Sequence, residues 1–202
     1  SVSAPIISNK IYDGTNSAEL GSTAELLAWS AVGAGDSDDG KAYEGDDIGV
    51  SQSSATATFE NKNVGIGKAV SFSGLSLSGD DANNYTFSMP NATASITAKA
   101  LSVSAPIISD KIYDGTDSAG SVTLGDLSGF VGHERVTATA IAFDLGSKDV
   151  GTYNTTVRYT LGDVANEGLA SNYTLAETQN VEASITAKAL SVTGVRPPSF
   201  VY

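Results

Sequence analysis

Short runs of alternating apolar and polar residues, many of them β-branched or aromatic, are spread along the whole chain. Such runs predict β-strands, because successive side chains of a strand face opposite sides of a sheet. Asp-Gly, Gly-Asp and single glycines separate the runs and predict turns. The pattern therefore predicts an all-β protein, either an immunoglobulin-like antiparallel sandwich or a β-grasp-like sheet. The clearest runs lie at 55–59, 69–77, 84–89, 93–103, 135–143, 153–161 and 181–192.

One stretch allows a second interpretation. Residues 17–32 include Glu25-Leu26-Leu27-Ala28-Trp29, whose composition also suits a short helix. The matching stretch after Ser118 is rich in Gly, Val and Thr and lacks this character. We therefore expect strands in both stretches.

The sequence repeats itself. Residues 1–18 match 102–119, an offset of 101 residues, with differences only at Asn9 and Asn16, which are Asp110 and Asp117 in the second copy. The offset falls further along because the first copy carries extra residues near its middle. Repetition at such a period is typical of tandem modules. Three further matches keep the same order, 61–67 with 147–153, 83–87 with 171–175, and 94–103 with 183–192.

These matches predict β modules at 1–99 and 100–188, the first with an acidic insertion loop, followed by the start of a third module at 189–202. The final residues align with 101–113, which indicates the first strand of a further copy and a chain taken from a longer array. Ile-Thr-Ala-Lys-Ala-Leu-Ser-Val closes one module and opens the next without Pro or Gly. We therefore expect a short, stiff joint and an elongated array.

Composition narrows the classes of function. The 202 residues include 11 Lys and Arg against 23 Asp and Glu, a net charge of −12. A negatively charged chain is repelled by phosphates and anionic lipids, which argues against nucleic acid and membrane surfaces as partners. The chain has no cysteine, which excludes disulfides, thiolate metal ligands and a cysteine nucleophile. No run approaches the ~20 apolar residues that span a bilayer.

Four sequence elements in a fixed order resemble the YDG and MBG repeat families. They are Lys-Ile-Tyr-Asp-Gly-Thr, Asn-Val-Gly or Val-Gly-Thr-Tyr, Asn-Tyr-Thr and Ile-Thr-Ala-Lys-Ala-Leu-Ser-Val, and they cover both modules nearly end to end. Repeats of these families occur in large bacterial surface proteins, often filamentous-haemagglutinin-like adhesins. The resemblance implies secreted stalk modules at the bacterial cell surface, with no catalytic residues to transfer.

The phrase Lys-Ile-Tyr-Asp-Gly-Thr predicts a strand that ends in a turn. Glycine takes positive φ without penalty, Asp hydrogen-bonds back to turn amides, and Tyr brings a hydroxyl that needs a partner. We interpret the phrase as structural because a fold needs its turn in every module. An acidic ligand contact at Asp13 or Asp114, or an isopeptide bond from Lys10 or Lys111, is the alternative. The turn residues are Tyr12, Asp13, Gly14, Tyr113, Asp114 and Gly115.

An acidic loop in the first module is the sharpest candidate for a ligand site. Ca²⁺ binds about six to eight oxygens, supplied by just such side chains. The EF-hand order fails, since Lys41 stands where glycine is required, and the second module lacks the cluster. A solvated loop is the competing interpretation. The candidate metal ligands are Asp36, Asp38, Asp39, Glu44, Asp46 and Asp47.

Two further side chains are candidates for chemistry. Trp29 either fills the core or binds a ligand such as a sugar. His133 is the only histidine, and it lies beside charged residues in what reads as a surface turn. No phosphate-binding, nucleophile-elbow or metalloprotease motif occurs, so we expect no enzyme and no cofactor other than Ca²⁺.

The sequence as a whole predicts a stalk or spacer repeat of a bacterial cell-surface adhesin, which extends and presents a distal binding region. Its partners are then neighbouring repeat modules of the same chain. The alternative is a ligand-binding adhesin module that recognises a host-surface glycan or protein. In neither case do we expect nucleic-acid binding or membrane insertion.

Overall fold

The computed structural model describes residues 2–33, 39–88 and 91–194. Its regular elements are β-strands and two short 3-10 turns, η1 (Ala82–Asn84) and η2 (Ala170–Asn172), which confirms the all-β prediction. Between residues 17 and 32 the structure has β2 (Ser17–Ala18) and β3 (Trp29–Ser30) rather than a helix. In the described part of the chain, no helix has the length and hydrophobicity needed to span a bilayer.

The chain forms two compact units. Unit 1 comprises Ser1–Lys99, Phe130–Glu134 and Asn166–Thr174. Unit 2 comprises Ala100–Gly129, Arg135–Ala165 and Leu175–Tyr202. Two short segments of the second sequence repeat therefore belong to the unit that the first repeat forms.

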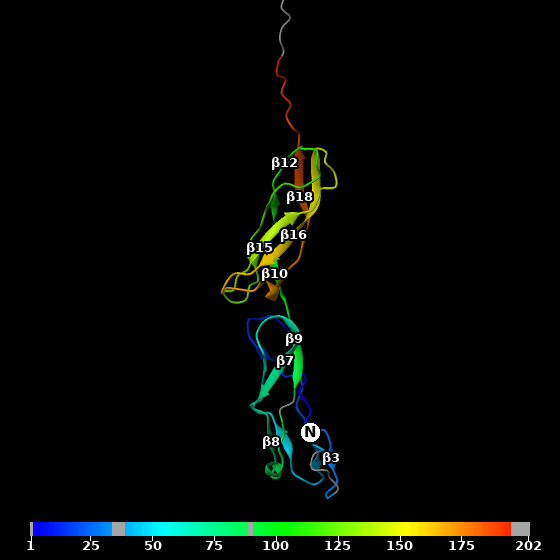
Figure 1. Ribbon diagram of the computed structural model, residues 1–202, viewed down its shortest axis with the longest axis vertical. Coiled ribbons are helices and arrows are strands. Elements are labelled where there is room, and N and C mark those ends of the chain that lie inside the picture. Colours follow the sequence, from blue (N-terminus) through cyan, green and yellow to red (C-terminus); the bar gives the residue numbers. More distant parts are fainter. Residues whose placement is uncertain (1, 34–38, 89–90, 195–202) are drawn as a thin grey trace, which may run out of the picture. The chain divides into compact units, whose positions relative to one another are not determined.

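Unit 1 is built on a five-stranded sheet in the order β1-β9-β7-β6-β2, of which β9 and β7 are labelled in Figure 1. Its edge strand β1 runs parallel to β9, whereas the other pairs are antiparallel. Parallel neighbours need a long connection, and here nearly the whole repeat lies between them. The remaining strands of this sheet are β1 (Lys10–Ile11), β6 (Thr56–Phe59), β7 (Gly65–Ser73) and β9 (Ala92–Thr97), and smaller pairs are β3 with β4 (Ala42–Tyr43) and β5 (Gly49–Ser51) with β8 (Ser76–Ser78).

Unit 2 is built on a four-stranded sheet in the order β12-β18-β16-β15 (Figure 1). Again the edge strand, β12, runs parallel to the last strand of the repeat, β18. Its strands are β12 (Lys111–Ile112), β15 (Thr137–Ala142), β16 (Gly151–Gly162) and β18 (Thr178–Thr186), with small pairs β11 (Ile107–Ile108) with β13 (Val122–Thr123) and β10 (Lys99–Val103) with β14 (Leu127–Ser128). The short strand β17 (Tyr173–Leu175), which follows η2, pairs with the other side of β10 and makes this pair a three-stranded sheet in the order β14-β10-β17.

The main sheets of the two units share the order of four strands, since β1-β9-β7-β6 matches β12-β18-β16-β15. Lys10 lies opposite Ile96 in the parallel pair of unit 1, and Lys111 lies opposite Ile185 in that of unit 2. The sequence predicts antiparallel modules, but the main sheet of each unit has one parallel pair at its edge, and the small pair of β3 with β4 in unit 1 is parallel too. The consequence is that the Lys-Ile-Tyr-Asp-Gly-Thr phrase begins as an edge strand and leaves the sheet as a loop.

Each sheet packs its alternate side chains into a small core. Ile96 is 1 % exposed in unit 1 and its counterpart Ile185 is 2 % exposed in unit 2. An equivalent backbone bond holds the loop after the phrase in each repeat, from Phe59 N–H to the Asn16 carbonyl in unit 1 and from Leu145 N–H to the Asp117 carbonyl in unit 2. The core residues are Ala57, Phe59, Val70, Phe72, Ala94 and Ile96 in unit 1, and Ile108, Leu145, Val157, Ala183 and Ile185 in unit 2.

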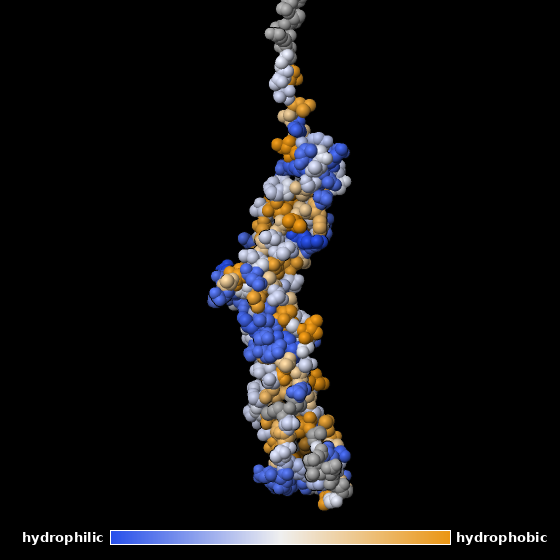
Figure 2. All heavy atoms as spheres, in the orientation of Figure 1, coloured by the Kyte–Doolittle hydropathy of each residue, from blue (hydrophilic) through white to orange (hydrophobic). Residues whose placement is uncertain are grey.

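The outer surface is mostly polar, with small groups of hydrophobic residues spread among hydrophilic ones on the visible face (Figure 2). The exposed apolar residues include Leu190 and Val192, at 92 % and 86 %. Leu101, the counterpart of Leu190, is 6 % exposed and lies on β10, the middle strand of the sheet β14-β10-β17. Residues 187–194 form no strand, and 195–202 lie outside the described residues.

Candidate functional site

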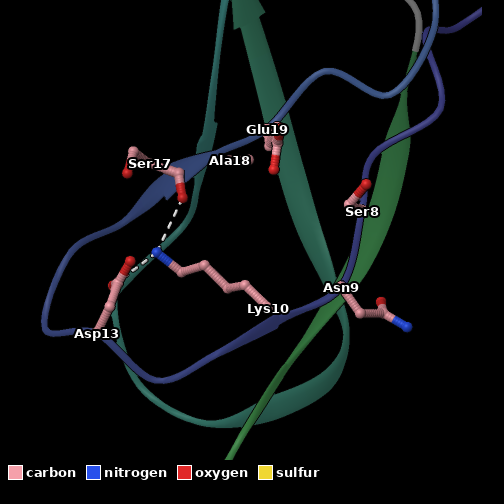
Figure 3. A pocket seen from close by; sticks show the side chains of 7 residues that line it. All are labelled: Ser8, Asn9, Lys10, Asp13, Ser17, Ala18 and Glu19. Carbon is pink, nitrogen blue, oxygen red and sulfur yellow. Dashed lines mark hydrogen bonds and ion pairs between the residues drawn. The ribbon is translucent and has the colours of Figure 1, made fainter.

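A lysine fastens the turn of the repeated phrase in unit 1. Lys10 Nζ donates to the Asp13 carboxylate at 2.8 Å and to the main-chain carbonyls of Thr15 and Ser17, both at 2.9 Å. Figure 3 shows the ammonium directed at Asp13 and Ser17, while Asn9 points away from it. Asp13 also accepts from the Thr15 N–H at 2.9 Å, which closes an Asx turn. Lys10, Asp13 and Ser17 also line a pocket of about 440 Å³, together with Ser8, Asn9, Ala18 and Glu19.

The same lysine-centred turn forms in unit 2. Lys111 Nζ lies 2.9 Å from the Asp114 carboxylate and 3.0 Å from the carbonyls of Thr116 and Ser118. Asp114 accepts from the Thr116 N–H at 2.9 Å. The repeated letters therefore build the same hydrogen-bonded turn in both units.

The turn uses its charges internally. A lysine has three N–H donors, and the carboxylate and two carbonyls around Nζ accept all of them. Burial alone would raise the pKa of Asp13, but hydrogen bonds from Lys10 and Thr15 outweigh it and hold the pKa below its usual value. At Asp114, the hydrogen bond from Lys111 and those from Thr116 lower the pKa to about 2. Each carboxylate is thus ionised at neutral pH and paired with its lysine.

The tyrosine of the phrase lies in a second polar cluster of unit 1. Tyr12 is 1 % exposed, and its hydroxyl donates to Glu134, whose two carboxylate oxygens lie at 2.7 and 2.8 Å. Lys62 Nζ pairs with the same carboxylate at 2.6 Å. The Tyr173 hydroxyl donates to it at 2.8 Å and accepts from the Val131 N–H at 3.1 Å. One carboxylate thus gathers two phenols and an ammonium.

An asparagine completes this cluster. Asn172 is 1 % exposed, and its Oδ1 accepts from the Val64 N–H at 3.0 Å. Its Nδ2 donates to Asn63 Oδ1 at 3.1 Å. We call these side chains, Tyr12, Lys62, Asn63, Glu134, Asn172 and Tyr173, the tyrosine cluster.

Burial and charge act together on the groups of the tyrosine cluster. Burial would raise the pKa of Glu134, but hydrogen bonds from Lys62, Tyr12 and Tyr173 outweigh it and lower the pKa. Burial, followed by the hydrogen bond to Glu134, raises the pKa of Tyr12. Burial and Glu134 also raise the pKa of Tyr173, to about 12. The cluster therefore keeps one carboxylate ionised and its two phenols protonated.

The acidic loop is held by its own hydrogen bonds where it is described. Asp39 accepts from the Lys41 N–H at 2.9 Å and from Ser30 Oγ at 3.0 Å. Asp46 accepts from the Tyr85 hydroxyl at 2.5 Å, and Asp47 from the Asp80 N–H at 3.3 Å. Among the described residues, which include Glu44 but not Asp36 or Asp38, no three acids or histidines are arranged to hold a metal ion. Ca²⁺ binding stays a prediction, which a rise in melting temperature on adding Ca²⁺ would support.

The other two candidates lie apart from these clusters. Trp29 is 44 % exposed on β3, so its ring is not a core residue. His133 is exposed at the tip of its loop, as the sequence predicts. Its neighbour Glu134, which sequence reasoning treats only as a charged residue of a surface turn, is the centre of the tyrosine cluster.

Sequence reasoning missed Lys62, Glu134 and Tyr173 as functional residues. The available signal was the match between Asn84-Tyr85 and Asn172-Tyr173, which predicts an asparagine bonded to backbone. Asn172 does accept from a backbone N–H, that of Val64, which lies 108 residues away in the sequence.

The comparisons with known proteins agree with the internal repeat. The YDG domain family matches residues 1–94 and again 97–180. No curated protein matches the chain, and no solved structure matches it.

Proposed function

The chain belongs to the YDG domain family, and from this premise we propose that it is a stalk repeat of a bacterial cell-surface adhesin. Its task is to extend and present a distal binding region outside the cell. The proposal has no catalytic step and needs no cofactor. Its partners are neighbouring repeats of the same chain.

The lysine-centred turn is the observation that carries this proposal. A binding or catalytic site needs groups that are free to meet a ligand. Lys10 and Lys111 donate their N–H groups to acceptors of their own loops, in two units whose main sheets share the order of four strands. A residue pattern that is repeated and internally satisfied supports an architectural role.

The covalent connection supports a stiff array. Strand β9 ends at Thr97 and β10 begins at Lys99, so Ala98 alone separates two strands. A connection this short leaves few free backbone dihedrals, unlike a Gly/Ser-rich linker. We therefore propose that successive repeats are held in line.

Small-angle X-ray scattering of the 202-residue chain tests the proposal. We expect a distance distribution with the long tail of two modules in line. Inserting a Gly/Ser linker after Ala98 should broaden that distribution and serves as the matched control. A compact globule, unchanged by the linker, would refute the stalk proposal.

The exposure of Trp29 favours the alternative function, a module that recognises a host glycan or protein. Aromatic rings left 44 % exposed are common contacts for sugars and proteins. Binding of the chain on a glycan or host-protein array, abolished by Trp29→Ala, would favour this function. Equal binding by the Trp29→Ala variant would reject Trp29 as the contact.

A further inference from the structure

Two identical tyrosines have different surroundings. Tyr12 is 1 % exposed inside the tyrosine cluster. Tyr113 occupies the same place in the repeated phrase and is bonded in the same way, since the N–H groups of Tyr12 and Tyr113 donate to Thr97 and Thr186, both at 2.8 Å. Tyr113 is nevertheless only half-buried, and its hydroxyl has no hydrogen bond among the described residues.

The residues near Tyr113 are also less covered than the matching residues near Tyr12. A Cβ on Gly14 would lie 2.7 Å from Val131 Cγ1, whereas a Cβ on Gly115 would meet nothing within 4 Å. Lys62 and Val64 of unit 1 correspond to Lys148 and Val150 of unit 2. Val64 is half-buried and bonded to Asn172, whereas Val150 is 58 % exposed. Unit 2 thus presents the tyrosine side of the cluster without the loops that cover it in unit 1.

The loop side of the cluster is also present in two copies. Tyr173 accepts from the Val131 N–H and donates to Glu134, three residues further on. Tyr85 accepts from the Tyr43 N–H at 2.9 Å and donates to Asp46, also three residues further on. The covered copy has Asn172 and Tyr173 at 1 % and 5 % exposure, whereas Asn84 is exposed and Tyr85 half-buried.

We propose that the Tyr113 end of the second repeat is a docking surface for the loops of a following YDG repeat in the same polypeptide. This rests on the proposed function, since a stalk requires successive repeats. The following repeat supplies an acid, a tyrosine and an asparagine at the positions of Glu134, Tyr173 and Asn172. Charge agrees, because Lys148 and the Tyr113 hydroxyl are donors that fit a carboxylate, and both loop copies carry an acid, Asp46 or Glu134.

The Asp46–Tyr85 loops form the reciprocal surface. They carry the hydrogen bonds that prearrange a carboxylate for a tyrosine of a preceding repeat. The chain therefore contains one complete tyrosine cluster, around Glu134. It also contains the two components of a second cluster, the surroundings of Tyr113 and the loops of Asp46 and Tyr85. In an array, every phrase tyrosine is covered by the next repeat.

The test is a three-repeat chain in which residues 1–192 are followed directly by residues 104–202. Ala183–Val192 copies Ala94–Val103, so the new junction reproduces the existing one. Amide hydrogen exchange is read at Val64 and Val150. In the 202-residue chain Val64 should exchange slowly, through its bond to Asn172, and Val150 quickly. In the three-repeat chain Val150 should become as slow as Val64.

An Asn172→Ala change made only in the added copy is the matched control. It should return Val150 to fast exchange and leave Val64 slow. The proposal is overturned if the added copy is folded, as judged by protected amides in its equivalent of β16, and Val150 still exchanges quickly. It is equally overturned if Val150 slows but the control has no effect.

A second design guards against an added copy that does not fold. Here residues 3–103 follow residue 192, so the first repeat offers its Asn84, Tyr85 and Asp46 to Tyr113. Slow exchange at Val150 supports the docking surface, and fast exchange beside a folded added copy overturns it. Scattering from the same chains separates the two proposals, because an elongated array with an exposed Val150 rejects this contact and leaves the stalk function standing.

Discussion

The rings of Tyr12 and Tyr173 meet edge to face, with 5.5 Å between their centroids and 80° between their planes. Both hydroxyls donate to Glu134, so the ring contact and the shared carboxylate position each other. Lys62 lies 5.9 Å above the Tyr12 ring and supplies the counter-charge. An aromatic pair of this geometry contributes about 0.5–1.5 kcal/mol beyond the area that it buries. Tyr12 is therefore a packing residue with a specific polar partner.

Replacing Glu134 with Gln should destabilise unit 1. The carboxylate is 17 % exposed and holds two phenols and Lys62, and a neutral amide loses the ion pair and one acceptor oxygen. We expect a loss of about 1–3 kcal/mol in the free energy of unfolding, measured by urea denaturation. Glu182→Gln, an exposed position on β18, should stay within about 0.5 kcal/mol. Equal effects of the two changes would reject the role assigned to Glu134.

Gly14 and Gly115 form a natural matched pair. Both have positive φ, +80° and +87°, so Ala costs about 1 kcal/mol of backbone strain at either. At Gly14 the added methyl would also lie 2.7 Å from Val131 Cγ1. Gly14→Ala should therefore lower the melting temperature more than Gly115→Ala. If the two variants melt alike, Val131 does not pack against this turn.

Stability should fall in acid through the lysine-centred turns. The pKa of Asp114 is about 2, below its ordinary 3.8. Its carboxylate form is therefore more favourable in the folded state than in the unfolded state. This stabilisation is present above the ordinary pKa and is lost as pH falls from about 4 towards 2. The midpoint of urea unfolding should drop across this window. Asp114→Asn should flatten that dependence, while Asp126→Asn, at an exposed position, should keep it; the reverse result would contradict the turn's role.

The tyrosine cluster should weaken in base. The pKa of Tyr173 is about 12, above its ordinary 10, so its protonated phenol stabilises the folded state below pH 10. That contribution is lost as pH rises from about 10 to 12. Ultraviolet titration should show late-ionising tyrosines that ionise at lower pH in Glu134→Gln, while burial, the larger cause, still keeps their pKa above the ordinary value. A single titration step, unchanged by this substitution, would contradict the shared carboxylate.

Much of the architecture was predictable from local pattern. The repeat and its alternating runs indicate an all-β tandem protein, because the same residues in each repeat should form the same sheet. The Asp-Gly turn was also predictable, since Asp13 and Gly14 have strong local preferences for turns. The pairing of β1 with β9 could not be predicted, because a two-residue strand carries no sequence signal for a partner at the far end of the repeat.

The tyrosine cluster could not be predicted for the same physical reason. Tyr12 and Glu134 lie 122 residues apart and come from different repeats, so no window of sequence contains both. Glu134 follows His133 in a polar turn and looks like any solvated acid. A comparison of the two copies gives one signal for the cluster. In each copy an acid, Asp46 or Glu134, precedes the Asn-Tyr-Thr element.

The most direct measurement of the central claim, that the repeated residues serve architecture, compares Tyr12→Phe with Tyr113→Phe in the 202-residue chain. Each change removes one hydroxyl from the same phrase. Tyr12→Phe should lower the free energy of unfolding by about 1.5–3 kcal/mol through the lost bond to a carboxylate, whereas Tyr113→Phe should change it by less than about 0.5 kcal/mol. Equal losses, or no loss at Tyr12, would contradict the account.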